Sequence, residues 1–247
     1  MPTVCVIVPC YNEANRLSAD AFLGYLSKHT DVSFCFVNDG STDQTQAVLT
    51  QLQARYPGQI TVLNLPQNAG KAGAVRAGML HSAQTTPMFD YLGYFDADLA
   101  TPLDAIGDLS AVLDQTPALD LVMGSRIKYL GTDIRRDTFR HYAGRIVATF
   151  ISNILKLPVY DSQCGAKLFR HQAVVPLFQE PFISPWLFDV ELLARLIRQH
   201  GRGPVLTRVA ERPLRQWIEM DGSRIRPSYY VKLWYELYRI RQTYRSL

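Results

Sequence analysis

Tyr91-Leu92-Gly93-Tyr94-Phe95-Asp96-Ala97-Asp98 places two carboxylates, one residue apart, directly after a short apolar run. The run predicts a buried β-strand, so Asp96 and Asp98 would stand at its carboxyl end, where open α/β sheets bind ligands. Hard cations such as Mg²⁺ and Mn²⁺ take oxygen ligands and commonly bridge a protein carboxylate to substrate phosphates. The pair therefore predicts a nucleotide-phosphate site, and a solvated turn is its alternative when the pair is considered alone.

Outward from this strand, short β-branched or aromatic runs alternate with segments of helix length. Strands are predicted at 4–8, 33–38, 60–65, 91–95 and 121–124. Helices are predicted at 14–29, 43–55, 71–84, 102–114, 140–155, 186–200 and 228–244. The alternation predicts an α/β fold with a mostly parallel central sheet, helices on both faces, and binding residues at the carboxyl ends of the strands.

The composition is that of a folded protein, because 47% of the 247 residues are hydrophobic and 19% are charged. We expect one domain over residues 1–227 and an amphipathic helical extension over 228–247. The four cysteines lack metal-binding spacing, which favours reduced thiols and a cytoplasmic location. No apolar stretch approaches the roughly 18 to 20 residues that span a bilayer, so a transmembrane chain is not expected.

Positive charge is unevenly distributed although the net charge is only +4. Two groups contain most of it: Arg126, Lys128, Arg135, Arg136, Arg140 and Arg145, then Arg224, Arg226, Lys232, Arg239, Arg241 and Arg245. These groups imply phosphate-bearing substrates or a membrane surface as partners, and no nucleic acid is expected. The C-terminal segment also interleaves aromatic residues with cations, which suits a membrane interface or packing against the sheet or a partner subunit.

Polar segments follow four consecutive strands or strand–helix junctions. They are Pro9-Cys10-Tyr11-Asn12-Glu13, Asn38-Asp39-Gly40-Ser41, Asn68-Ala69-Gly70-Lys71 and Asp96-Ala97-Asp98. Asp39 can accept from a ribose hydroxyl or a base edge, and Lys71 opens a helix whose N-terminus favours phosphate. Each segment alone could be an ordinary turn or helix cap. Together they predict a nucleotide site.

Through these four segments the chain resembles the inverting family 2 glycosyltransferases of the GT-A fold. Further segments resemble the dolichyl-phosphate glucosyltransferase branch, which is related to the dolichol-phosphate mannose synthases. These segments are Gly124-Ser125-Arg126, 161–169, 186–193 and 219–224. The resemblance covers nearly the whole chain and implies a GT-A catalytic domain over residues 1–227.

The resemblance implies metal-dependent transfer of a sugar from a nucleotide sugar, with UDP-glucose the first candidate, to a polyprenyl or dolichyl phosphate at the cytoplasmic face of a membrane. Residues matching the family's donor and metal positions are Pro9, Tyr11, Glu13, Asp39, Lys71, Asp96 and Asp98, the last two holding Mg²⁺ or Mn²⁺. Arg126, Arg140 and Arg224 would take the acceptor phosphate. The mannose synthases have a glutamine where this chain has Ala100, which counts against a mannose donor.

The expected reaction depends more on stabilising negative charge than on transferring a proton. A metal held by Asp98 would stabilise the leaving diphosphate. A phosphate monoester is already anionic near neutral pH, so it needs orientation more than deprotonation. Arg126 and Arg140 are therefore predicted to matter more than any general base, and surface ion pairs with Asp133 or Asp137 are the alternative for these arginines.

Two other functions remain open from the sequence. If the acceptor is a sugar hydroxyl, Asp189 is the candidate general base. The chain could instead be a noncatalytic nucleotide-sugar-binding subunit beside a membrane partner. We expect no N-terminal anchor of the kind that the eukaryotic glucosyltransferases carry, so an integral membrane subunit or the membrane surface itself would supply attachment. The oligomeric state stays open.

Overall fold

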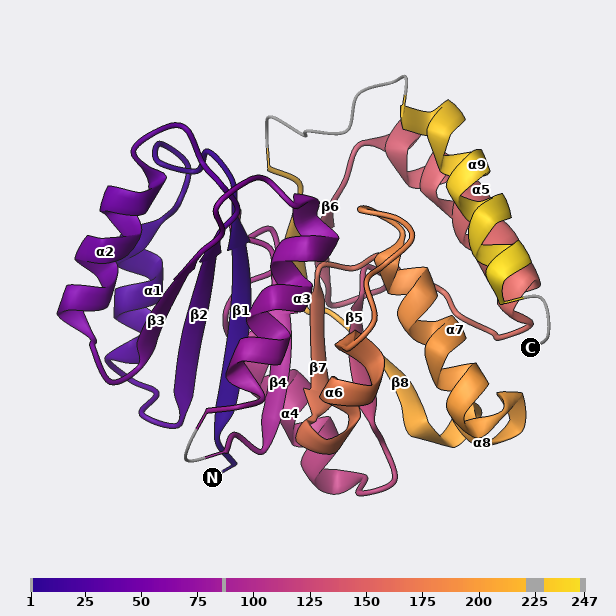
Figure 1. Cartoon of the computed structure of the whole chain (residues 1–247). Helices are drawn as coiled ribbons and strands as arrows, with labels where there is room; N and C mark the ends of the chain where they lie inside the picture. The colour runs from indigo at the N-terminus through magenta and orange to yellow at the C-terminus, as the bar shows by residue number, and fades with distance from the viewer. Residues whose placement is uncertain (1, 86–87, 221–228, 245–247) are drawn as a thin grey trace.

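The computed structural model describes residues 2–85, 88–220 and 229–244. Its centre is a seven-stranded sheet of order β3-β2-β1-β4-β7-β5-β8, in which β7 runs antiparallel to both β4 and β5 (Figure 1). The strands of this sheet are β1 (Val4–Cys10), β2 (Val32–Asn38), β3 (Ile60–Asn64), β4 (Tyr91–Phe95), β5 (Leu121–Ser125), β7 (Ala166–Arg170) and β8 (Val209–Pro213). A separate two-stranded sheet pairs β6 (Asp133–Arg135) with β9 (Gln216–Ile218).

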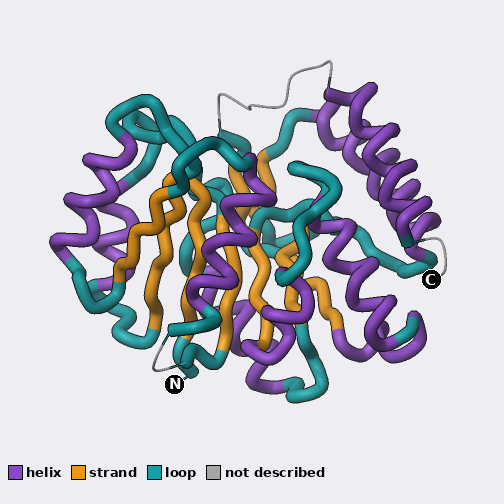
Figure 2. Tube along the Cα trace, in the orientation of Figure 1, coloured by secondary structure: helices purple, strands orange, loops and turns teal. Residues whose placement is uncertain are grey.

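Helices cover both faces of the central sheet (Figure 2). They are α1 (Ala19–Leu26), α2 (Thr45–Arg55), α3 (Gly70–Ser82), α4 (Ala105–Gln115), α5 (Thr138–Leu155), α6 (His171–Phe178), α7 (Phe188–His200), α8 (Arg202–Arg208) and α9 (Tyr229–Thr243). Helices α1, α2 and α4 pack on one face, while α3, α6 and α7 pack on the other. The predicted α/β architecture is confirmed.

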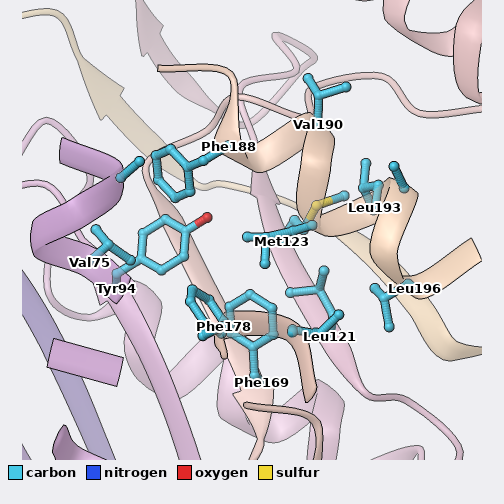
Figure 3. Packing of buried hydrophobic residues seen from close by; sticks show 14 of the residues in the cluster. Val75, Tyr94, Leu121, Met123, Phe169, Phe178, Phe188, Val190, Leu193 and Leu196 are labelled. Atoms are coloured by element: carbon cyan, nitrogen blue, oxygen red, sulfur yellow. The ribbon is translucent and has the colours of Figure 1, made fainter. Parts of the chain in front are cut away.

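The strands are apolar on both sides because each side faces a helical layer. Along β1, Val4 and Val6 belong to the core under α1 and α4, whereas Cys5 and Ile7 belong to the core under α3. Figure 3 shows the core on the face covered by α3, α6 and α7, where Tyr94 of β4 lies among residues of these three helices. All four cysteines are free and buried, as expected for structural thiols.

Two sequence expectations differ from the structure. The helix predicted at 14–29 begins only at Ala19, because the amides of Arg16 and Leu17 both donate to the Glu13 carbonyl and form a turn. The central strand β7 and the elements β6, α6, α8, β8 and β9 were not predicted. These elements are short, and β7 contains Lys167 and Arg170, so its sequence does not look like a buried strand.

Helix α9 packs against the same core as α7. Its residues Leu233, Leu237 and Ile240 are buried in that core, as is Tyr244 directly after it. Arg195 Nε lies 3.2 Å from the Tyr244 hydroxyl oxygen. A domain boundary between residues 227 and 228 stays a prediction, and α9 does not form a separate core. Among the helices of the described residues, none combines the length and apolarity that crossing a membrane requires.

Candidate active site

The loops after β1 and β2 are tied together at the carboxyl edge of the sheet. The Asn12 amide donates to Ser41 Oγ at 3.0 Å, and the Thr42 amide donates to Asn12 Oδ1 at 2.9 Å. Asn12 has a φ of 50°, a left-handed conformation that asparagine tolerates better than most residues. The two polar segments that the sequence placed at separate strand ends therefore form one surface.

Asp39 connects this surface to the start of α3. Its Oδ1 accepts a 2.7 Å hydrogen bond from the Ala69 amide, and burial raises the pKa of Asp39 although hydrogen bonds from the Ala69 and Gly70 amides lower it. The adjacent Gly40 has a φ of 61°, and a Cβ there would lie 2.6 Å from the Asn68 nitrogen. Glycine is required at this crossing because any side chain would collide with the backbone leading to Lys71.

Lys71 and the acidic pair meet at the same edge. Lys71 Nζ lies 2.5 Å from Asp96 Oδ1. Burial alone would lower the pKa of Lys71, but the carboxylates of Asp96, Asp189 and Asp98 raise it above its usual value. Burial and the negative charge of Asp96 raise the pKa of Asp98, whose Oδ1 accepts from the Ala100 amide at 3.0 Å. We call Asp39, Lys71, Asp96 and Asp98 the donor edge.

The acidic pair fits a divalent cation bound with a substrate. Burial and the adjacent negative charge of Asp96 raise the pKa of Asp98, and a cation between the two carboxylates would relieve their mutual repulsion. Within residues 2–85, 88–220 and 229–244, no group of three or more His, Cys, Asp or Glu side chains could hold a metal by itself. Remaining ligands would therefore come from a diphosphate or from water, as is usual for Mg²⁺.

The other predicted donor residues lie near this edge. Pro9 is in β1 and pairs in register with Val37 of β2. Tyr11 is exposed, and Glu13 is buried with Oε2 3.8 Å from Arg16 Nε. Their roles in donor binding stay predictions.

Arg126 directly follows β5 and is held by a carboxylate. Its Nε and Nη2 each donate to Asp161 at 2.7 Å, and its backbone amide donates to Asp161 Oδ2 at 3.0 Å. The Asp161 amide in turn donates to Glu211 Oε1 at 2.7 Å. Arg126 pairs with Asp161 and not with Asp133 or Asp137, the surface pairing considered as the alternative to a phosphate role.

Arg126 shares a small cavity with other cations. Arg136, His141, Arg145 and the hydroxyl-bearing Ser162 line the same cavity. Burial and the charge of Arg126 lower the pKa of Arg136, and burial together with Arg136, Arg145 and Lys128 lowers the pKa of His141. Positive charge is therefore in excess here. We call the cavity lined by Arg126, Arg136, His141, Arg145 and Ser162 the cationic pocket.

Ser162 supplies a second sign that the cationic pocket binds something. Its side chain is 2% exposed, and Oγ has no hydrogen-bond partner among the described residues. A buried hydroxyl without a partner is unfavourable unless a ligand or water completes it. Ser162 is one of the residues that line the cavity, so an anion held by the arginines could accept from its hydroxyl.

The other predicted phosphate residues lie outside this pocket. Arg140, in the first turn of α5, pairs with Glu219 at 2.5 Å and does not line the cavity. Arg224 lies outside the described residues. The sequence pointed to the whole basic stretch, but nothing in it distinguished Arg136 and Arg145 from Arg140.

Asp189 is buried in the first turn of α7 and does not face the donor edge as an open carboxylate. It is 4% exposed, and its Oδ1 lies 2.6 Å from Lys167 Nζ. The Tyr94 hydroxyl donates to the same oxygen. The role of general base stays a prediction, and this burial and pairing count against it.

A larger cavity of about 440 Å³ lies on the α1 side of the Asp96–Ala100 loop. Tyr25 of α1 and the residues Lys28 and His29 that follow this helix line it together with Leu99, Ala100 and residues of β9. The carboxylates of Asp96 and Asp98 do not line it, so it is separate from the donor edge.

The fold and the site together define a class of protein. A mostly parallel sheet with joined polar loops and an acidic pair at its carboxyl edge is the arrangement of the GT-A nucleotide-sugar transferases. Residues 5–178 match the family described as Glycosyl transferase family 2, and the chain belongs to that family. The predicted enzyme class, a glycosyltransferase, is confirmed.

Similar sequences are found among curated proteins. The chain is 32% identical to a dolichyl-phosphate beta-glucosyltransferase of Trichomonas vaginalis over 252 residues, covering 97% of this chain and 71% of that protein. It is 31% identical over 239 residues to the dolichyl-phosphate beta-glucosyltransferase of Homo sapiens, covering 90% of this chain and 69% of that protein. The predicted branch within the family agrees with these relatives.

Solved structures confirm the GT-A fold. A crystal structure of glucosyl-3-phosphoglycerate synthase from Mycobacterium tuberculosis in complex with phosphoglyceric acid superposes with a TM-score of 0.70 at 18% identity, covering 98% of this chain and 80% of that one. The same enzyme in complex with Mn²⁺, UDP-glucose and phosphoglyceric acid gives a TM-score of 0.69 at 17% identity, with the same coverage.

Proposed function

We propose that this protein transfers glucose from UDP-glucose to a polyprenyl phosphate such as dolichyl phosphate, with inversion at the sugar carbon and with a divalent cation held by Asp96 and Asp98. The acceptor is that named for the curated relatives, the dolichyl-phosphate beta-glucosyltransferases. The donor and the cation follow the chemistry of the donor edge. A structural neighbour crystallised with Mn²⁺ and UDP-glucose supports the same choice.

The cationic pocket carries this proposal. Asp161 and Ser162 lie at the pocket, and Gly165, three residues further along, packs against Asp96: a Cβ at Gly165 would lie 1.9 Å from Asp96 Oδ2. Burial lowers the pKa of Arg126, but the charge of Asp161 raises it above its usual value. The charge of Asp96 makes a smaller contribution in the same direction. An anionic acceptor in the pocket would therefore sit beside a donor at the donor edge.

The reaction that this arrangement suits needs little proton transfer. An oxygen of the acceptor phosphate forms a bond to the anomeric carbon, the bond between that carbon and the UDP oxygen breaks, and the electron pair leaves with UDP. A divalent cation at Asp96 and Asp98 supplies stabilisation of the negative charge on the departing diphosphate. Arg126, Arg136 and Arg145 hold the attacking phosphate, since guanidinium groups match phosphate oxygens.

The first experiment measures transfer of radiolabelled sugar to a short polyprenyl phosphate and, in parallel, to the matching polyprenol. UDP-glucose, GDP-mannose and UDP-N-acetylglucosamine are compared, each with Mn²⁺, Mg²⁺ or chelator. We expect metal-dependent glucose transfer to the phosphate. Transfer to the polyprenol at an equal rate would contradict the phosphate acceptor, and preference for another donor would contradict glucose.

Arg136 and Arg135 form a matched pair of variants within this assay. Arg136 lines the cationic pocket, whereas Arg135 is largely exposed and pairs with Asp133 at 2.8 Å. Arg136→Met should raise the KM for polyprenyl phosphate about tenfold or more, because a charge-assisted hydrogen bond contributes roughly 1.5–3 kcal/mol. Arg135→Met should change it less than about twofold. An equal change in the KM for polyprenyl phosphate in both variants would contradict binding of the acceptor phosphate in the cationic pocket.

We also propose that α5 and α9 dock on a membrane surface. Figure 1 shows the two helices side by side at one end of the molecule, and Phe150 and Trp234 pack edge to face with ring centroids 4.8 Å apart. Large apolar side chains remain exposed on both helices: Tyr142, Ile146, Phe150, Trp234, Tyr235 and Tyr238. Aromatic side chains with nearby cations suit the interfacial region of a bilayer.

Liposome cosedimentation tests this docking. Ile146 on α5 and Leu206 on α8 are both 57% exposed, so their glutamate variants are matched in size and exposure. Ile146→Glu should weaken binding to vesicles that contain anionic lipid, and Leu206→Glu should not. Removal of α9 is a poor test, because its buried face belongs to the core. Unchanged binding of Ile146→Glu would contradict the proposal.

A further inference from the structure

Three buried polar side chains interrupt the apolar core between the sheet and α7. They are Tyr94 of β4, Lys167 of β7 and Asp189 of α7, and neither Tyr94 nor Lys167 has any exposed surface. Figure 3 shows Tyr94 surrounded by apolar neighbours, including Val75 and Phe188. A buried ion pair is weak support for stability, since apolar residues of similar volume often serve as well. Its presence here calls for another role.

The Lys167 ammonium group joins Asp189 to the backbone that precedes β7. Nζ lies 2.6 Å from Asp189 Oδ1 and donates to the Cys164 carbonyl at 2.6 Å. The Tyr94 hydroxyl donates to the same carboxylate oxygen. In the antiparallel register, Tyr94 pairs with Lys167 and Phe95 pairs with Ala166, so the start of β7 lies beside the end of β4. The cluster thus fixes the turn at Cys164-Gly165.

That turn forms the floor under Asp96. The Asp96 amide donates to the Gly165 carbonyl at 3.1 Å. The Asp96 carboxylate packs so closely on Gly165 that an added Cβ would come within 1.9 Å of Oδ2. Lys71 Nζ lies 2.5 Å from Oδ1 of the same carboxylate. Movement of the turn would therefore change where Asp96 points.

We propose that Lys167 and Asp189 are positioning residues for the donor: their buried ion pair, completed by Tyr94, holds the Cys164-Gly165 turn and through it the orientation of the Asp96 carboxylate. The inference rests on the proposed function, because it takes Asp96 as a donor and cation residue. Asp189 acts here through Lys167 and contacts no acceptor. Its contribution then appears in nucleotide binding and not in proton abstraction from the acceptor.

Asp189→Asn and Glu191→Gln make a matched pair for the test. Both residues lie in the first turn of α7, both are buried, and both pair with a buried cation, Lys167 for Asp189 and Arg195 for Glu191 at 2.8 Å. Each variant should lower Tm, because each leaves a buried charge without its partner. Only Asp189→Asn should raise the KM for UDP-glucose and the Kd for UDP with Mn²⁺, each about tenfold, with the KM for polyprenyl phosphate within about twofold.

A double variant separates positioning from stability. Lys167→Met with Asp189→Leu removes both charges and refills the volume, so Tm should rise above that of Asp189→Asn, even though the Tyr94 hydroxyl loses its acceptor. The weakened binding of UDP should persist, because the Cys164 carbonyl is no longer held. A well-folded double variant that binds UDP with unchanged Kd would overturn the proposal. Loss of kcat by several orders of magnitude in Asp189→Asn with unchanged donor binding would also overturn it, in favour of a general base.

Calorimetric binding of UDP with Mn²⁺ requires no acceptor, so the positioning role and the proposed acceptor fail independently. If no polyprenyl phosphate product forms but Asp189→Asn still weakens UDP binding, the proposed acceptor fails and the positioning role stands. If polyprenyl phosphate product forms but Asp189→Asn leaves UDP binding unchanged, the positioning role fails and the proposed acceptor stands.

Discussion

At the donor edge the Lys71 ammonium faces the Asp96 carboxylate, whereas in the cationic pocket three arginines share one carboxylate, that of Asp161. Asp96 is paired with Lys71 at 2.5 Å before any ligand arrives. In the pocket, burial and Arg126 lower the pKa of Arg136, and Asp161 is the carboxylate that lines it. We infer that the excess of positive charge in the pocket favours an entering anion, whereas Lys71 already compensates Asp96 at the donor edge.

The largest expected effect comes from breaking the donor edge. Asp98→Asn should reduce transfer about a thousandfold, because the charge that holds the cation beside the leaving diphosphate is lost. Steady-state transfer with saturating Mn²⁺ measures it. Asp104→Asn, at the exposed N-cap of α4, is the control and should retain activity. Near-normal transfer by Asp98→Asn would remove the cation from the proposed mechanism.

A smaller loss is expected when the donor edge is displaced without removing a charge. Gly165→Ala should lower kcat/KM for UDP-glucose about tenfold to a hundredfold, since its Cβ would push the Asp96 carboxylate aside. The KM for polyprenyl phosphate should stay within about twofold. Gly107→Ala is the matched control, because it lies within α4 with open space around its Cβ position and should stabilise the helix by roughly 1 kcal/mol. A rise in the KM for polyprenyl phosphate alone would contradict the assignment of the donor to the donor edge and of the acceptor to the cationic pocket.

In the cationic pocket, one substitution should improve stability and weaken function. Ser162→Ala removes a buried hydroxyl that lacks a partner within the described part of the chain, so the free energy of unfolding should rise by about 1 kcal/mol. The KM for polyprenyl phosphate should rise about fivefold, because an anion loses one donor. Thermal unfolding and acceptor titration measure the two effects. Lower stability with unchanged acceptor KM would show that Ser162 has a structural partner instead.

The smallest effect concerns pH. Burial and neighbouring cations lower the pKa of His141 below its ordinary value of about 6.5. Because the unfolded chain then binds the proton more readily, the contribution of neutral His141 to stability is complete above that value and is lost as pH falls through the folded-state pKa. Tm measured from pH 7.5 to 5 should fall slightly more steeply for the unsubstituted protein than for His141→Gln. Identical slopes would mean that the pocket cations do not act on His141.

Sequence patterns predicted the donor edge better than the cationic pocket. Asp39, Lys71 and Asp96 each follow a strand or open a helix, and parallel strands bring such positions to one edge without further information. Arg126 also follows a strand, and for that reason it was among the predicted residues. Arg136 and Arg145 lie in a long stretch with many basic residues, and the sequence does not distinguish them from Arg140. In the structure they line the same cavity as Ser162, and Arg140 does not.

The sequence by itself determined five of the seven strands of the central sheet, the presence of helices on both faces and the carboxylates at its edge, because the spacing of apolar residues and the residues at strand ends are local properties. Tertiary structure alone decided that β7 enters the centre of the sheet antiparallel to β4 and β5. That insertion pairs Lys167 with Asp189, sets Gly165 under Asp96 and brings Ser162 to the arginines. These contacts join residues far apart in the chain, and the geometry that joins them appears only when both faces of the sheet are packed.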